Sequence, residues 1–419
     1  MTTDERGMRP RDWGWLVCLM LVSFAIGTDD FVIAGVLPAI SADLRVNEAT
    51  AGQLVTAFSV TYAVAAPPLA VATATVPRRL LVIGGMSVFA LVNLVSALAP
   101  NYPVLMALRV LSALVAAAIT PATFAMAERL ASPERAGRAI GVVAAGLTVS
   151  LFLGVPIGAF LGSTFGWRST FVAVGLFSLA VAAAGALLLP AVAGSVTSGV
   201  RAQLRTLSRP AVLLCVAGTT AGACAGLMTY TYIAPITRDL TGGDGPILAL
   251  LIAVVGLSGA AGTFLCGRAT DRWGADRTLL ATYAGLVAAT VALTLIGVVG
   301  RGTAPVWLLA GALAVWGFAG WGFNPPMNMR MLRLAPDAGT EAVALNTSGL
   351  YVGIAFAGAI GGMVLAGGGG GVGVTVAAAG IGAATLVLMA VSVRRFPSPT
   401  PQGSSRPIED TSAPPRPAG

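Results

Sequence analysis

Long apolar stretches alternate with short polar segments along this chain, from residue 13 to residue 393. A helix that crosses the hydrocarbon core of a bilayer needs about 20 mostly apolar residues. Runs of that length recur throughout the chain, and each predicts a transmembrane helix. The pattern therefore predicts an all-α polytopic membrane protein with 12 transmembrane helices, at 13–39, 49–73, 79–99, 103–127, 137–162, 168–190, 211–236, 246–267, 278–299, 304–329, 342–366 and 371–393.

The content of charged residues supports this interpretation and excludes several functions. Hydrophobic residues make up 56% and charged residues 10% of the 419 positions, whereas a soluble domain carries about 25% charged residues. All 25 basic residues are Arg, and the chain has neither Lys nor His. A P-loop ATPase and Schiff-base catalysis need Lys, while most catalytic zinc and haem sites need His. We therefore expect no enzyme, no cofactor and no metal site.

The positions of the Arg residues predict the orientation in the membrane. If the N-terminus is cytoplasmic, 20 Arg residues fall in cytoplasmic segments and four fall on the other side, namely Arg45, Arg168, Arg238 and Arg301. Cytoplasmic loops carry the Arg excess, so both termini are predicted to lie inside. The pI of about 10.0 then reflects topology rather than nucleic-acid binding. We expect a monomer in the cell membrane, without a nucleic-acid partner.

The chain divides into two halves of six helices each. Residues 13–190 and 211–393 form these halves. The linker at 191–210 carries three Arg residues at a spacing of four, which predicts a short amphipathic cytoplasmic helix. Residues 1–12 and 394–419 are predicted to be cytoplasmic ends, and the second of these is rich in Pro and Ser, which is typical of disorder.

Three features recur in both halves in the same order. Residues 38–44 and 235–240, at the ends of the first helix of each half, resemble each other, and basic residues follow the second helix of each half. Parallel six-helix repeats with a binding site between them are a transporter architecture. Small residues spaced four apart in the fifth helices let helix backbones pack closely in lipid: Gly146, Ser150, Gly154, Gly158 and Gly162, and Gly349, Gly353, Ala357 and Gly361.

Two adjacent carboxylates lie inside the first predicted helix. Asp29 and Asp30 each cost about 2.5–3.5 kcal/mol to insert, so such residues are usually kept for a function. Adjacent helical residues point about 100° apart, so at most one of the two faces a central cavity. We predict that Asp30 carries the transported proton, with Asp29 as the second candidate, and that the intramembrane Arg109 at similar depth pairs with the other. The alternative is an ion pair that only ties two helices together.

Polar and aromatic residues on several predicted helices are candidates to line the central cavity. Aromatic rings with a few polar groups suit a broad amphipathic ligand better than a sugar held by many hydrogen bonds. The alternative for each side chain is packing between helices. The candidates are Gln53, Thr56, Tyr62, Tyr230, Tyr232, Trp321, Asn324, Asn346 and Tyr351.

Several motifs resemble those of the major facilitator superfamily. The loop at 267–277 is similar to the family's loop signature, through Gly267, Asp271, Arg272, Gly274 and Arg277. Arg109 is similar to the family's proton-transfer motif, and the fifth helix resembles the antiporter motif of its exporters, through Gly146, Gly154, Pro156 and Gly158. The segment 27–38 resembles the twelve-span drug:proton antiporters, most of all the chloramphenicol, arabinose-type and purine exporters of bacteria.

The resemblance implies roles for these motifs, but one loop of this chain departs from the family's pattern. It implies that Gly154, Pro156 and Gly158 act in gating or packing. The opposite charges of Asp271, Arg272 and Arg277 predict salt bridges between helices that break as the halves rock, and the alternative is a solvated positive-inside loop. In the first half, the corresponding loop has Ala70, Ala74 and Thr75 where Gly, Asp and Arg are expected. The charge-relay form of the inner gate is therefore not expected on that side.

Together these features predict a transporter. The leading hypothesis is a proton-coupled antiporter that exports small amphipathic molecules, such as antibiotics, by alternating access. The alternative is an exporter of a native metabolite, such as a nucleobase, a sugar or the host's own antibiotic. A membrane-embedded enzyme or receptor is disfavoured by the missing His and Lys, the short loops and the repeated halves.

Overall fold

A computed structural model describes residues 10–132, 135–194, 208–243, 245–335 and 338–398. Within these ranges, 12 helical segments are long and apolar enough to cross a membrane. The predicted all-α fold with 12 spans is therefore confirmed. An even number of spans places the two described ends of the chain on one side, which the Arg distribution predicts to be cytoplasmic. The helix expected in the linker falls largely on residues outside the described ranges.

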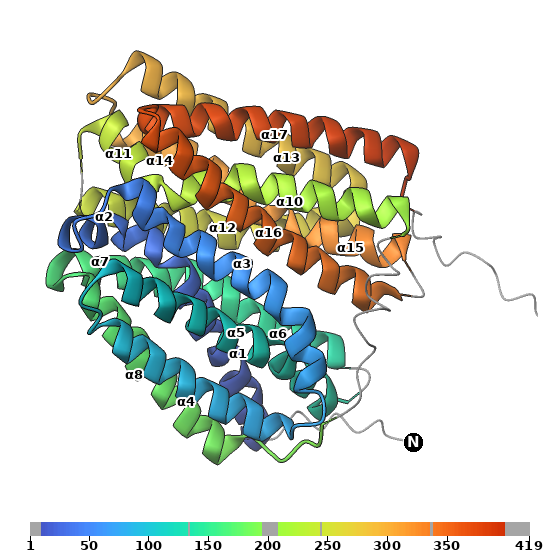
Figure 1. Cartoon of the computed structure of the whole chain (residues 1–419). Coiled ribbons are helices and arrows are strands. Elements are labelled where there is room, and N and C mark those ends of the chain that lie inside the picture. The colour runs from blue at the N-terminus through green and yellow to red at the C-terminus, as the bar shows by residue number, and fades with distance from the viewer. Residues whose placement is uncertain (1–9, 133–134, 195–207, 244, 336–337, 399–419) are drawn as a thin grey trace, which may run out of the picture.

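Each half contributes six spans, and the two halves lie against each other (Figure 1). The N-terminal half consists of α1 (Pro10–Phe31), α2 (Ile33–Asp43), α3 (Glu48–Ala72), α4 (Arg78–Ser96), α5 (Tyr102–Leu130), α6 (Ala136–Val149), the π-helix η1 (Ser150–Gly154), α7 (Val155–Phe165) and α8 (Trp167–Leu188).

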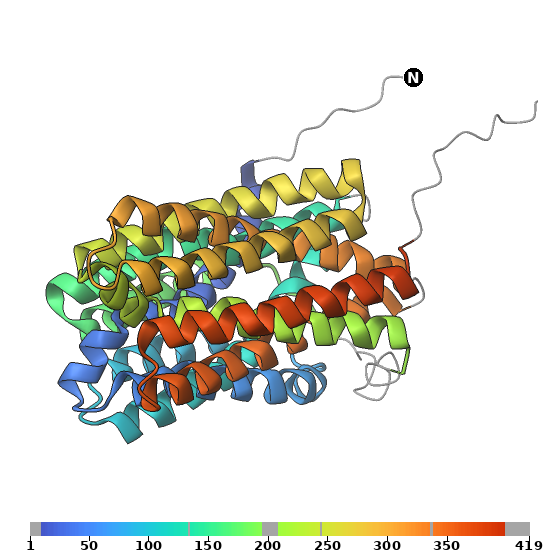
Figure 2. The same ribbon diagram turned by 90° about the horizontal axis from the view of Figure 1, so that it is seen from above.

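The C-terminal half repeats this plan, and the view from above shows its helices beside those of the first half (Figure 2). It consists of α10 (Pro210–Thr231), α11 (Ile233–Thr241), α12 (Pro246–Trp273), α13 (Ala275–Val299), α14 (Val306–Gly322), α15 (Asn324–Leu334), α16 (Gly339–Ala366) and α17 (Gly370–Arg395).

Four spans are interrupted within the membrane, although hydropathy predicts them as continuous. The first span breaks at Val32 between α1 and α2, and the seventh breaks at Tyr232 between α10 and α11. The tenth breaks at Phe323, and the fifth widens into η1. Irregular backbone at membrane depth is tolerated where protein buries it or where it lines a cavity. The breaks in the first and seventh spans occupy corresponding positions in the two halves.

An aspartate at the outer end of each of these broken spans anchors the start of its half's last helix. Asp43 accepts hydrogen bonds from the Trp167 indole N–H and from the Arg168 guanidinium. Asp239 accepts one from the backbone N–H of Gly371. The hydrogen bonds from Arg168 and Trp167 lower the pKa of Asp43 below its usual value. The outer segments α2 and α11 are therefore fixed to α8 and α17.

The small residues of the fifth span bring it against the first span. A methyl group on Gly146 would lie 2.2 Å from the Met20 carbonyl oxygen, and one on Gly154 would lie 2.1 Å from the Thr28 hydroxyl. One on Gly158 would lie 2.4 Å from Cγ2 of Val32. Contacts this close require glycine, and they allow the backbones to approach as small residues do in membrane helix pairs.

Contacts between the halves run from the outer surface to the middle of the membrane. At the outer end, Arg238 of α11 donates to Glu48 of α3 at 2.6 Å. Deeper, the Gln53 amide donates to the Gly358 carbonyl of α16 at 3.2 Å. A methyl group on Gly256 of α12 would lie 2.4 Å from the η1 carbonyl of Leu151, so these helices also cross in close contact.

A buried Arg in the C-terminal half ties three helices together at their cytoplasmic ends. Arg330 of α15 is fully buried and donates to Asp276 at the start of α13. It also donates to the Ser392 carbonyl at 3.1 Å and to the Phe396 carbonyl at 2.7 Å. Asp276 in turn accepts from the Ser398 backbone N–H at 2.8 Å. The end of α17 and the residues after it are therefore fastened to α13 and α15.

This network generates a stability prediction. Asp276→Asn leaves the buried Arg330 without a carboxylate, and removing one partner of a buried ion pair costs about 3 kcal/mol or more. We expect a lower apparent melting temperature and earlier unfolding in mixed detergent micelles. The control is Arg277→Gln, which changes an exposed neighbouring charge. Equal stability of the two variants would contradict the structural role of the network.

Candidate functional site

The two carboxylates of α1 occupy different environments next to the break at Val32. Arg109 of α5 donates from Nη1 to Oδ2 of Asp29 at 2.8 Å and to the Asp29 carbonyl at 3.3 Å. The Ser112 hydroxyl donates to the same Oδ2 at 3.0 Å. The exposed fraction is 1% for the Arg109 side chain and 0% for that of Asp29. Asp29 therefore forms a buried ion pair that joins α1 to α5.

Asp30 is equally buried but unpaired. Its exposed fraction is 2%, and neither carboxylate oxygen has a hydrogen-bond partner at ordinary distance among the described residues. The polar side chains of Arg109, Asp29 and Tyr351 interact electrostatically with it. It borders a cavity of about 10 Å³, which is close to the smallest volume that holds one water molecule. The lining residues are Asp30, Phe31, Ala34, Val55, Leu227, Tyr230, Thr231 and Ile354.

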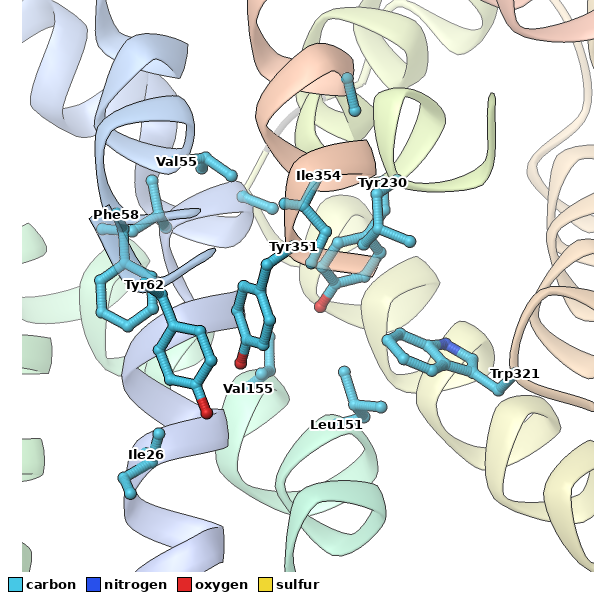
Figure 3. Packing of buried hydrophobic residues seen from close by; sticks show 14 of the residues in the cluster. Ile26, Val55, Phe58, Tyr62, Leu151, Val155, Tyr230, Trp321, Tyr351 and Ile354 are labelled. Carbon is cyan, nitrogen blue, oxygen red and sulfur yellow. The ribbon is translucent and has the colours of Figure 1, made fainter. Parts of the chain in front are cut away.

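A row of aromatic rings leads from the ion pair to the opposite half. The Arg109 guanidinium lies 4.5 Å from the centre of the Phe58 ring, a cation–π distance. The rings of Phe58 and Tyr62 stack at 6.4 Å, and the Tyr62 ring stacks on that of Tyr351 at 3.9 Å. Since Tyr62 belongs to α3 and Tyr351 to α16, this last contact crosses between the halves (Figure 3).

Further aromatic residues complete the surroundings of Asp30. Phe31 meets the ring of Tyr230 edge-on at 6.1 Å and that of Trp321 at 5.4 Å. Figure 3 shows Tyr62, Tyr351, Tyr230 and Trp321 gathered around one region between the helices. The Tyr230 hydroxyl is buried without a hydrogen-bond partner among the described residues, as is the Trp321 indole N–H. Four of the predicted lining residues thus lie together near the predicted proton site.

Other predicted lining residues take part in contacts within the protein. The Tyr232 hydroxyl donates to the Gly358 carbonyl at 2.6 Å, the same oxygen that accepts from Gln53. A methyl group on Gly358 would lie 2.3 Å from the Thr56 hydroxyl. Tyr232 and Gln53 therefore share one carbonyl in the contact between α3 and α16, on the outer side of the tyrosine stack. The Thr56 hydroxyl lies close to Gly358 but is buried without a hydrogen-bond partner among the described residues.

The predicted asparagines lie on α15 and α16 of the C-terminal half. The buried Asn346 accepts a hydrogen bond from the Thr219 hydroxyl at 2.6 Å and donates to Asn328 at 3.3 Å. This chain links α10, α15 and α16. Asn324 is half-buried as the first residue of α15.

The charged residues of the predicted gate are on the surface. Asp271, Arg272 and Arg277 are exposed, and none of them makes an ion pair within the part of the chain that the structure describes. The ion pair of this region is formed instead by Asp276 and Arg330, which sequence reasoning did not single out. A signal was present, because Arg330 ends an interrupted apolar run that holds no other charge.

Sequence reasoning also missed the apolar members of the site. Phe31 and Phe58 touch the predicted functional residues, and Phe58 lies one helical turn before Tyr62 on the same face of α3. No three Cys, Asp or Glu side chains gather as metal ligands among the described residues.

Comparisons with known proteins agree with this architecture. The family model described as Major Facilitator Superfamily matches residues 19–342. The inner membrane transport protein YdhP of Escherichia coli is 30% identical over 383 residues, which cover 91% of this chain and 96% of that protein. A protein of Mycobacterium tuberculosis named as a chloramphenicol efflux pump is 32% identical over 365 residues, covering 86% of this chain and 88% of its own.

A solved structure shows the same fold. It is a bacterial homologue of the human lysosomal transporter Spinster in an inward-facing, occupied conformation. The TM-score is 0.71 at 19% sequence identity, with 94% of this chain and 100% of that chain covered.

The unequal partners of the two carboxylates generate a prediction about stability. Asp29→Asn removes the counter-ion of a buried Arg, which costs about 3–5 kcal/mol, whereas Asp30→Asn replaces a buried carboxyl group that has no ionic partner. We expect Asp29→Asn to lower the apparent melting temperature in nanodiscs and Asp30→Asn to leave it equal or raise it. The opposite order would show that the assignment of Arg109 to Asp29 is wrong.

Proposed function

The chain belongs to the major facilitator superfamily and is a multi-pass membrane transporter rather than an enzyme, and from this premise we propose that it is a proton-coupled exporter of small amphipathic molecules. Transport proceeds by alternating access, with the two halves exposing a central site to each side of the membrane in turn. Protons moving inward drive the substrate outward.

The observation that carries this proposal is the buried, unpaired carboxyl of Asp30. An isolated carboxylate is costly to bury in apolar surroundings, and this cost disappears when it binds a proton. Opening of the site to water on either side restores the hydration of the charged form. Asp30 is therefore expected to bind a proton in the conformation that buries it and to release the proton in a conformation that opens the site to water.

The ion pair beside it has a supporting role in this proposal. Arg109 is neutralised by Asp29, so the pair remains charged and fixed while Asp30 changes its protonation state. Its guanidinium Nε and Nη2 have no hydrogen-bond partner among the described residues. A neighbouring guanidinium favours the charged form of a carboxyl group, which aids release of the proton once water reaches Asp30.

In this proposal, the contacts between the halves break and re-form as the halves move. Outward opening must break the Glu48–Arg238 pair and the hydrogen bond from Gln53 to Gly358. The close contacts of Gly154 with Thr28 and of Gly158 with Val32, together with Pro156, would allow the fifth span to shift against the first. We assign the exposed Asp271, Arg272 and Arg277 to charge pairs formed in a second conformation.

The substrate class of small amphipathic molecules rests on the aromatic surroundings of Asp30. Phe31, Tyr62, Tyr230, Trp321 and Tyr351 supply apolar faces with few hydrogen-bonding groups, which suits such ligands. The relative named as a chloramphenicol efflux pump supports an antibiotic as one substrate.

Proton coupling generates a transport prediction. In proteoliposomes, Asp30→Asn is expected to abolish substrate-driven proton movement, measured with a pH-sensitive dye inside the vesicles. Exchange of labelled for unlabelled substrate, which needs no net proton transfer, should continue in this variant. Asp30→Glu serves as the matched control and should keep part of the proton flux. Normal proton flux through Asp30→Asn would refute the assignment.

A further inference from the structure

Tyr62 and Tyr351 form an unusual contact between the two halves. Their rings lie face to face, with 3.9 Å between centroids and 25° between planes. The exposed fractions are 4% for Tyr62 and 8% for Tyr351. Each half contributes one ring, so any movement that separates α3 from α16 at this depth also separates the two faces (Figure 3).

Buried polar groups without partners lie around this stack. Asp30 interacts with Tyr351, but neither of its carboxylate oxygens has a partner at ordinary hydrogen-bond distance among the described residues. The hydroxyls of Ser59, on the same helix as Tyr62, and of Tyr230 also have no hydrogen-bond partner among the described residues. Buried polar groups are normally satisfied, and a group left without a partner calls for a ligand, a water molecule or another functional explanation.

The chemistry of these groups defines the ligand that would complete them. Two parallel aromatic faces bind a flat ring between them, since offset-stacked rings attract through both contact area and their quadrupoles. A carboxylate accepts hydrogen bonds but donates none. A ligand that satisfies the ionised form of Asp30 therefore carries an O–H or N–H group next to its ring.

We propose that Tyr62 and Tyr351 are the two sides of a clamp for a flat aromatic ring, whose attached O–H or N–H donor binds Asp30. This inference rests on the proposed function and specifies its substrate class. When the site is empty the rings close on each other. When it is filled, the ligand ring lies between them and contacts both halves at once.

The clamp also links substrate binding to the proton. A donor group of the ligand stabilises the ionised form of Asp30, whereas a bound proton neutralises that form. Ligand binding therefore favours loss of the proton, as an exchange of one for the other requires. A ligand without a donor would fit between the rings but would not displace the proton.

The test uses three probes of similar size with purified protein in nanodiscs. The probes are 2-naphthylmethanol, its fully saturated decalin analogue, and 2-(methoxymethyl)naphthalene, which lacks the donor. Isothermal titration calorimetry measures the binding of each. We expect 2-naphthylmethanol to bind at least tenfold more tightly than either of the other two. If the aromatic and the saturated alcohol bind equally, or if neither binds, the clamp is refuted. This result needs only the unmutated protein.

Variants then test whether the stacked tyrosines cause the preference for the aromatic ring. Tyr62→Leu and Tyr351→Leu should abolish the preference for the aromatic ring, whereas Tyr62→Phe and Tyr351→Phe should retain it because they keep the stacked faces. The control is Tyr102→Leu, which removes a half-buried ring at the outer end of α5 and should leave the preference intact. Preference retained in both leucine variants would show that the stack only packs the halves together.

The outcome for the clamp is separable from that for the proposed function. A ring preference that depends on Tyr62 and Tyr351, in a protein without proton flux, supports the clamp and refutes proton coupling. Proton flux through Asp30 with no preference for the aromatic ring supports the proposed function and refutes the clamp.

Discussion

The buried ion pair between Arg109 and Asp29 determines how the first span can work. A charge inside a membrane protein must be paired or it costs several kcal/mol, and Arg109 pairs with Asp29 but not with the adjacent Asp30. The 100° between neighbouring helical residues directs Asp29 to α5 and leaves Asp30 toward the interface of the halves. Pairing one acid thus isolates the other, and the isolated acid is the group on which we place proton coupling.

The arrangement of the halves places the candidate site at the depth where two of the spans are interrupted. The first and seventh spans break two residues after Asp30 and Tyr230, at Val32 and Tyr232. Their outer segments are tied to α8 and α17 through Asp43 and Asp239. The site therefore lies where fixed outer segments join the inner segments of the same spans. Contact between the halves includes the stacked tyrosines, so the aromatic residues that surround Asp30 also belong to the interface that must open.

Much of this organisation could be predicted from the sequence, because it depends on hydropathy and helix period alone. The 12 spans, the two halves and the different directions of Asp29 and Asp30 are of this kind. The break at Val32 was not predictable, since hydropathy does not register a local change in backbone hydrogen bonding. The sequence also marked Gln53 as a candidate lining residue, but it did not reveal that Gln53 binds the Gly358 carbonyl. Likewise, the partners of Arg330 include residues 392–398, which are remote in sequence.

Infrared difference spectroscopy of the protein in nanodiscs tests most directly whether Asp30 holds an exchangeable proton. A protonated carboxyl group has a C=O stretching band that a carboxylate lacks. We predict that this band is present in the substrate-free protein, is retained in Asp29→Asn, is absent in Asp30→Asn, and disappears when a transported substrate is added. A band that persists with saturating substrate, or that is lost in Asp29→Asn rather than in Asp30→Asn, would contradict the account.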